Sequence, residues 1–191
     1  SANQAPSRGA SEGRIARSLK RLNLGLRYQP VFALDTGALN GVEALLRAES
    51  DAAAALTARA VVRMATAEGR MPEITELVVG DAARVAAQMV QAGHADFKAS
   101  VNISIEQLLD RGFVAAVSRA LAEHGLPPRH LQLEVPEHSL VDSTRAVAVL
   151  EEVASLGVLV VIDDFWANAP ALLTQLPSVT GVKVDISRTG G

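Results

Sequence analysis

Residues 158–164 read VLVVIDD, five consecutive apolar residues followed by two aspartates. An unbroken apolar run of this length is typical of a strand that is buried on both faces, as in a parallel sheet. An amphipathic helix is predicted just before it, over residues 143–156, and Gly157 ends that helix. A strand buried on both faces needs helices packed around its sheet, so this segment predicts an α/β fold.

The same alternation continues on both sides of this segment. Asp35-Thr36-Gly37 is a turn signal that joins the first two predicted strands into an antiparallel hairpin. Ser104 and Gln107 have the spacing of a capping box and begin a helix directly after a strand. The predicted strands cover residues 24–34, 39–47, 97–103, 131–135, 158–162 and 181–186, and the helices 14–22, 57–68, 72–91, 104 onward, 112–124, 143–156 and 170–176.

This count predicts an incomplete TIM-barrel-like fold. A closed barrel of this kind has eight strands and about 250 residues. Here about six strands are found in 191 residues, and the chain stops after the sixth. We therefore expect an open, mainly parallel sheet whose two edges are covered by a helix, by the N-terminal segment or by a second copy of the chain.

Composition narrows the classes of function. The chain is 49% hydrophobic with a net charge of −3, which favours a packed domain over one that coats a nucleic acid polymer. It has no cysteine, which excludes disulfides and thiolate metal sites. No apolar run reaches the ~18–20 residues of a membrane-spanning helix, so no membrane insertion is expected in this segment. Residues 1–13 are interpreted as a flexible linker or an expression remnant, and residues 14–191 as the domain.

Polar side chains stand inside or at the end of five predicted strands. Because the carboxyl ends of parallel strands form the active face of such folds, these side chains are expected to converge. Packed carboxylates repel one another unless a cation offsets them, and hard divalent cations prefer oxygen ligands. A pair of metal ions is a recurrent solution for phosphodiester hydrolysis. The residues concerned are Glu43, Asn102, Glu134, Asp163, Asp164, Lys183 and Asp185.

Several of these residues, and Arg47, also have a plainer interpretation. A strand-end aspartate such as Asp163 or Asp164 is more often a cap for the next helix. Glu43 and Arg47 suit a solvent-exposed surface, and Lys183 suits the outward face of an alternating strand. Only the coincidence over five strands favours a metal site, with Lys183 orienting water and Arg47 pairing with phosphate. The four histidines lack ligand spacing and are interpreted as surface or structural residues, and Trp166 as a packing residue.

Seven short segments follow one another in a recognisable order. They are YQPV at 28–31, DTG at 35–37, EALLR at 43–47, VNIS at 101–104, LEVPE at 133–137, DDF at 163–165 and VKVD at 182–185. In this order they resemble the EAL family of cyclic-di-GMP phosphodiesterases. The resemblance extends from about residue 24 to residue 186, and the EALLR segment matches the family signature outright.

The resemblance implies a TIM-barrel-like EAL fold that hydrolyses cyclic-di-GMP to pGpG with Mg²⁺ or Mn²⁺ in the bacterial cytoplasm. It implies cyclic-di-GMP as ligand and either a homodimer or another protein partner. It also implies roles for individual residues: metal ligands Glu43, Asn102, Glu134, Asp163 and Asp164; catalytic residues Glu43, Asp164 and Lys183; and dinucleotide contacts from Gln29, Leu46 and Arg47.

Three departures from the family pattern predict impaired turnover. Residues 166–171 read WANAPA where the family has a Gly-Thr-Gly-Tyr-Ser-Ser loop, and glycine permits backbone shapes that other residues resist. The later family segments that supply a Glu and a Gln do not follow residue 186, and residues 48–57 look shortened. We therefore expect weak or absent hydrolysis, with or without loss of metal binding by this chain. The alternatives are a working phosphodiesterase, a non-catalytic cyclic-di-GMP receptor or protein scaffold, and an unrelated metal-dependent α/β enzyme.

Overall fold

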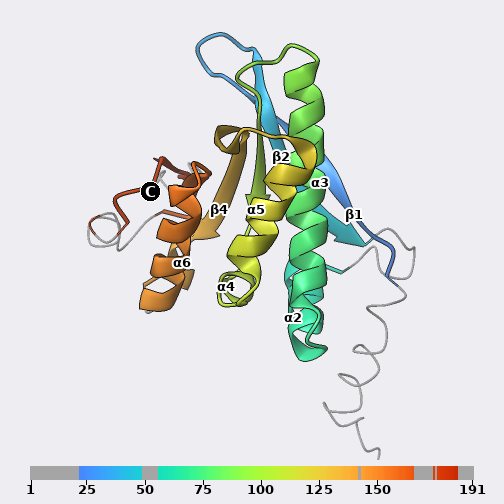
Figure 1. Ribbon diagram of the computed structural model, residues 1–191, viewed down its shortest axis with the longest axis vertical. Coiled ribbons are helices and arrows are strands. Elements are labelled where there is room, and N and C mark those ends of the chain that lie inside the picture. Colours follow the sequence, from blue (N-terminus) through green and yellow to red (C-terminus); the bar gives the residue numbers. More distant parts are fainter. Residues whose placement is uncertain (1–21, 49–55, 142, 166–173, 175, 185–191) are drawn as a thin grey trace, which may run out of the picture.

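The computed structural model describes residues 22–48, 56–141, 143–165, 174 and 176–184. Within them, six strands form one open sheet in the order in which they occur along the chain (Figure 1). The first two strands are antiparallel and every later neighbouring pair is parallel. The strands are β1 (Leu24–Phe32), β2 (Leu39–Ala48), β3 (Lys98–Asn102), β4 (Leu131–Pro136), β5 (Leu159–Asp163) and β6 (Gly181–Val182).

Helices cover one face of this sheet. Figure 1 shows α3, α5 and α6 side by side in front of the strands, with α2 and α4 at the end of the molecule toward which β2 and β4 point. None of the helices in the described ranges is both long and apolar enough to cross a bilayer. The helical elements are α2 (Ala58–Ala67), α3 (Met71–Gln91), α4 (Ile105–Leu108), α5 (Phe113–His124) and α6 (Thr144–Ser155), with short 3-10 turns η2 (Pro128–His130) and η3 (Glu137–Ser139).

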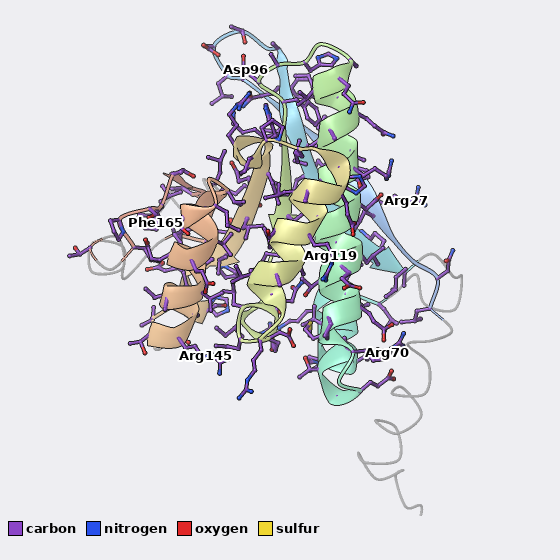
Figure 2. All side chains as sticks on the ribbon, in the orientation of Figure 1. Arg27, Arg70, Asp96, Arg119, Arg145 and Phe165 are labelled. Carbon is purple, nitrogen blue, oxygen red and sulfur yellow. The ribbon has the colours of Figure 1, made fainter. Side chains whose placement is uncertain are left out.

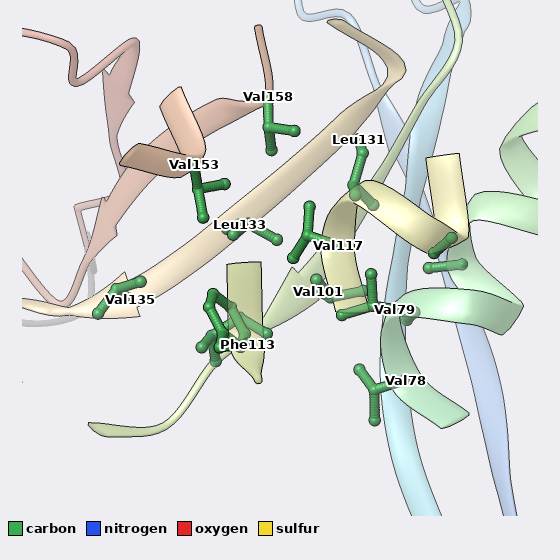
Figure 3. Close-up of a cluster of buried hydrophobic side chains, with 14 of the residues drawn as sticks. Val78, Val79, Val101, Phe113, Val117, Leu131, Leu133, Val135, Val153 and Val158 are labelled. Carbon is green, nitrogen blue, oxygen red and sulfur yellow. The ribbon is translucent and has the colours of Figure 1, made fainter. Parts of the chain in front are cut away.

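The main core lies between the helices and the sheet, as Figure 3 shows. Val101 and Leu133 project from neighbouring strands, and Phe113 and Val117 of α5 pack over them; all four are almost completely inaccessible to solvent. Burying such side chains contributes about 1.5–3 kcal/mol each relative to leaving them in water. This apolar layer holds the strands in register, so that the opposite face of the sheet can carry polar groups.

The predicted α/β alternation with an opening hairpin is confirmed, and most bounds agree within one or two residues. The first strand ends at Phe32 rather than at residue 34, because the hairpin turn already begins at Ala33, which donates to the carbonyl of Ala38 at 2.9 Å. The sixth strand is shorter than predicted, and residues 185 and 186 lie outside the described residues. The predicted helices at 14–22 and 170–176 fall almost wholly outside them as well.

Two local features place the polar end of β3. Ser104 and Gln107 form the predicted capping box, in which each side chain accepts a hydrogen bond from the other residue's backbone N–H. This box begins α4 two residues after Asn102 and fixes the path of the chain there. His130 is structural, as expected: it is buried, and its Nδ1 lies 2.8 Å from the carbonyl oxygen of Phe97.

Gly41 allows β2 to lie close to β3. A Cβ atom at this position would stand 2.3 Å from the carbonyl oxygen of Lys98, far inside van der Waals contact. The pairing of β1 with β2 also shifts register between Val31 and Phe32, next to the partner of Gly41. A glycine is required where two backbones approach this closely. Gly41 thereby sets the position of Glu43, two residues further along β2.

Tyr28 anchors the edge strand β1 to the helical layer. Its hydroxyl donates a hydrogen bond of 2.6 Å to Asp81 Oδ2 on α3, and Asp81 also accepts from Arg84 Nε at 2.8 Å. Burial raises the pKa of Tyr28, and the hydrogen bond to the Asp81 carboxylate raises it further. Since the folded-state pKa lies above the unfolded value, this contact stabilises the fold fully below about pH 10 and is lost as the pH rises through the folded-state pKa.

Tyr28 is the only tyrosine of the chain, so absorbance at 295 nm reports its ionisation directly. We expect the native protein to titrate with a midpoint clearly above the ordinary value of about 10, and the protein in guanidinium to return to it. Tyr28→Phe should lower the free energy of unfolding by about 1–2 kcal/mol at neutral pH, with a smaller difference above pH ~10. A native midpoint at the ordinary value would contradict the contact with Asp81.

Candidate functional site

The strand register places the candidate polar residues on one face of the sheet. Paired residues of neighbouring strands share a face, and so do residues two apart in one strand. Glu43 pairs with Ser100, which is two residues before Asn102, and Asn102 pairs with Glu134. Glu134 in turn pairs with Val161, which is two residues before Asp163. This face is opposite to the one that Val101 and Leu133 present to the helices.

Four of these residues are joined by hydrogen bonds across the sheet. Lys183 Nζ donates to Glu43 Oε2 at 3.0 Å and also to Glu134 Oε2. Asn102 Nδ2 donates to Glu43 Oε1 at 2.7 Å. We call Glu43, Asn102, Glu134 and Lys183 the carboxylate network. It links β2, β3 and β4 with the residue that follows β6, positions separated by up to 140 residues in sequence.

The network is buried at its centre and open at its rim. The Glu134 side chain is 1% exposed, that of Glu43 22% and that of Lys183 37%. Gln132 completes the surroundings of Glu134, because its Nε2 donates to Glu134 Oε1 at 3.1 Å and to Ser100 Oγ at 2.9 Å. Both oxygens of the buried carboxylate therefore have donors, as a charge in this position requires.

Electrostatics in the network follow from burial and from the single ammonium. Burial would raise the pKa of Glu43, but the hydrogen bonds from Asn102 and Lys183 outweigh it and hold that pKa below its usual value. Burial raises the pKa of Glu134, and the Lys183 ammonium offsets only part of this. For Lys183, burial lowers the pKa, but hydrogen bonds to Glu134 and Glu43 more than compensate and raise it. Lys183 is thus held as a cation between two carboxylates.

The two aspartates at the end of β5 stand beside this network without joining it. Asp163 is half-buried and Asp164 is exposed, and within the described part of the chain neither makes a hydrogen bond to the network. Asp164 has a φ of +53°, a left-handed conformation that is uncommon for residues other than glycine. Backbone hydrogen bonds hold Lys183 beside the two aspartates. The N–H of Lys183 donates to the Ile162 carbonyl at 2.8 Å, and the Lys183 carbonyl accepts from the Phe165 N–H at 3.2 Å.

The residues predicted to contact a dinucleotide lie on β1 and β2. Gln29 is exposed and pairs in register with Glu43. Leu46 is buried, whereas Arg47 is exposed and donates from Nη1 to the Leu46 carbonyl at 2.9 Å. Both Leu46 and Arg47 line a cavity of about 470 Å³ between the ends of β2 and β3 and helices α2, α3 and α4. Asn102, a member of the carboxylate network, also lines this cavity.

Ser100 and Gln132 were missed by the sequence interpretation. Each stands two residues before a candidate residue of the same strand, Ser100 before Asn102 and Gln132 before Glu134. The available signal was this spacing of two, which places a polar residue on the same face and directly beneath the site. The cavity-lining residues Arg59 and Arg63 of α2 were missed too, although two arginines four apart in an apolar helix could have drawn attention.

The donor set matches the chemistry of a divalent cation. Two carboxylates and an amide converge from adjacent strands, and oxygen atoms of this kind are the ligands that Mg²⁺ and Mn²⁺ prefer. Both carboxylates already bind one cation, the Lys183 ammonium. Among the described residues, however, no three acidic or histidine side chains lie close enough together to hold a metal ion as they are placed. The residue types therefore suit a metal ion, but the position between the two carboxylates is held by the Lys183 ammonium.

Comparison of the sequence with protein families identifies the family of this chain. The family model described as "EAL domain" matches residues 12–191, and the chain belongs to this family. The chain is 35% identical over 174 residues to the bifunctional diguanylate cyclase/cyclic di-GMP phosphodiesterase MucR of Pseudomonas aeruginosa. It is 34% identical over 178 residues to the uncharacterized protein Rv1357c of Mycobacterium tuberculosis. These matches cover 90% and 91% of the chain but only 25% and 56% of the two relatives.

Solved structures show the same fold. The chain aligns with the PaMucR phosphodiesterase in complex with c-di-GMP at a TM-score of 0.80 and 32% identity, covering 91% of this chain and 73% of that one. It aligns with the Xanthomonas citri FimX EAL domain in complex with c-diGMP at a TM-score of 0.77 and 26% identity, covering 95% and 74%. The predicted TIM-barrel-like EAL fold with an open sheet is thereby confirmed.

Replacing Lys183 tests whether it neutralises the buried carboxylate. Lys183→Met should lower the free energy of unfolding by about 1–3 kcal/mol at pH 7, less than for a wholly buried pair because solvent screens the lysine. In the variant, Glu134 has lost a cation that lowers its pKa, so that pKa should rise further. The loss of stability should therefore be full at neutral pH and shrink as the pH falls through the folded-state pKa of Glu134.

A matched variant separates charge from packing. Glu134→Gln combined with Lys183→Met removes the uncompensated charge but keeps a side chain of similar shape, so it should recover most of the stability. Urea unfolding curves of the wild type and both variants measure this. A Lys183→Met variant as stable as the wild type would show that Lys183 does not neutralise Glu134.

Proposed function

We propose that this domain binds cyclic-di-GMP at the carboxyl ends of its strands and hydrolyses it weakly or not at all. Two similarities support the ligand: the relative MucR is named a cyclic di-GMP phosphodiesterase, and the PaMucR and FimX structures are complexes with this dinucleotide. Gln29, Leu46 and Arg47 are the proposed contacts. The cavity beside Arg47 has an apolar floor and a cationic rim, which suits a ligand made of planar bases and phosphates.

The metal-binding residues in this proposal are Glu43, Asn102, Glu134 and Asp163, with Asp164 serving a second ion. EAL proteins are generally metal-dependent, and Mg²⁺ or Mn²⁺ is the proposed ion. When bound, such an ion would supply charge stabilisation at a phosphate oxygen and an acidic water molecule. Glu43, Asp164 and Lys183 are the proposed catalytic residues: the carboxylates orient the reacting groups, and the Lys183 ammonium positions the water and offsets developing negative charge.

A single observation carries the proposal of weak turnover. The Lys183 ammonium is hydrogen-bonded to both Glu43 and Glu134, the carboxylates that a metal ion would need. An ion that enters must displace an ammonium whose pKa the same carboxylates raise. Misplacement by about 1 Å can lower a rate on the order of a hundredfold. The left-handed Asp164 and the altered segment that follows it add a second source of misplacement.

The same observation favours the alternative, a non-catalytic receptor or scaffold. A network that closes on its own cation leaves the neighbouring cavity formed and accessible. A second copy of the chain or another protein is the proposed partner, because β1 and β6 are edges of the described sheet. Val31 and Phe32 of the edge strand β1 are also exposed, at 39% and 55%.

A turnover assay distinguishes these possibilities. In excess Mn²⁺, we expect the chain to produce pGpG from cyclic-di-GMP at least about a hundredfold more slowly than the PaMucR phosphodiesterase domain assayed beside it, because Lys183 holds the carboxylates that the metal ion needs. Glu43→Ala, which removes the carboxylate between Asn102 and Lys183, serves as the background control. Rapid pGpG production that disappears in this control would show that the domain is a working phosphodiesterase.

A further inference from the structure

Helix α2 presents two arginines to the cavity described above. Arg59 and Arg63 are four residues apart, which places them one above the other on the same face of the helix. Both are exposed and line the cavity together with Val62, which lies between them in sequence. The sequence of α2, ARAVVRMATA, contains no acidic residue, so nothing on the helix itself offsets the two charges.

This placement is electrostatically unfavourable for the isolated domain. Like charges four apart destabilise a helix by about 0.2–0.5 kcal/mol, and Arg59 stands in the first turn, where the helix dipole disfavours a cation. Throughout the part of the chain that the structure describes, neither arginine is paired with a carboxylate. An anion held between the two guanidinium groups would turn this repulsion into attraction.

The rest of the cavity indicates what kind of anion fits. Leu46, Val62, Ile74 and Ile103 give it an apolar floor on which a planar base can pack. The charged residues that line it are Arg47, Arg59, Arg63 and Glu106, three cations against one carboxylate. Guanidinium groups bind phosphate oxygens in pairs and stack on aromatic rings, so this lining suits a nucleotide rather than a small inorganic anion.

Resting on the proposed function, we infer that Arg59 and Arg63 bind a phosphate of the cyclic dinucleotide from α2 and hold the ligand without a divalent metal ion. Asn102 lines the cavity and donates a hydrogen bond to Glu43, so the ligand would lie directly beside Glu43. Lys183 already offsets the charge of Glu43 and Glu134, which removes much of the repulsion that these carboxylates would exert on a phosphate. The arginines supply the remaining attraction, and no ion is required.

Calorimetric titration of cyclic-di-GMP into the 191-residue chain in excess EDTA tests this inference. The wild type should bind, and Arg59→Gln/Arg63→Gln should bind at least about tenfold more weakly, since two charge-assisted hydrogen bonds are lost. The wild-type affinity should also fall more steeply with added salt than that of the double variant. Arg59→Lys/Arg63→Lys keeps the charge but loses the planar fork, and it should bind with intermediate affinity.

The matched control is Arg119→Gln/Arg145→Gln, which removes the same charge from α5 and α6. Figure 2 labels both residues, which are exposed and do not line the cavity. This control should bind within about twofold of the wild type. The two arginines make exposed contacts, to Glu76 and to the Leu109 carbonyl, that contribute little to stability. Thermal melts of all variants check that each is folded.

Four results would overturn the inference. Equal binding by the wild type and the Arg59/Arg63 glutamine variant would remove α2 from the ligand site while leaving the proposed function intact. An equal loss of affinity in the Arg119→Gln/Arg145→Gln control would show that overall charge, and not the position of the arginines, causes the effect. Wild-type binding that requires Mg²⁺ would show that the arginines do not replace the metal, and absence of binding with or without Mg²⁺ would overturn the proposed ligand as well.

Discussion

The Lys183 ammonium lies between two carboxylates, Glu43 and Glu134, that reach it from separate strands of the sheet. A buried carboxylate such as Glu134 is tolerated only when a cation and hydrogen-bond donors satisfy it. The pairing therefore constrains the register of β2, β3 and β4 and the position of the chain after β6. Gly41 supports the same arrangement, because it lets β2 approach the Lys98 carbonyl of β3 and so aligns Glu43 beside Asn102.

Around this pairing, the structure has two neighbouring regions that differ in charge. The carboxylate network is closed by its own cation, whereas the cavity under α2 is lined by three arginines and one glutamate. Asn102 is the residue that the two regions share. We propose that a domain arranged in this way retains a phosphate-bearing ligand next to the carboxylates without an ion between them. In that proposal, the two regions are the physical basis on which binding and hydrolysis separate.

Much of the fold could be predicted from the sequence, because apolar runs such as residues 158–162 and caps such as Ser104 with Gln107 are local signals. The convergence of Glu43, Asn102, Glu134 and Lys183 followed from strand ends meeting at one edge. Their partners could not be predicted: that Lys183 bonds both carboxylates depends on side-chain geometry across three strands. Ser100 and Gln132 escaped notice because short polar residues in strands also occur on exposed faces. The arginines of α2 were not singled out, since only the tertiary structure places a cavity beside them.

Calorimetric titration of Mn²⁺ into the ligand-free protein tests the central claim most directly, because it measures the competition between Lys183 and a metal ion without any turnover. Lys183→Met removes the ammonium and leaves Glu43, Asn102 and Glu134 in place. Our account predicts that this variant binds Mn²⁺ at least about tenfold more tightly than the wild type, since the ion no longer displaces a bound cation. Equal or weaker Mn²⁺ binding by the variant would contradict it.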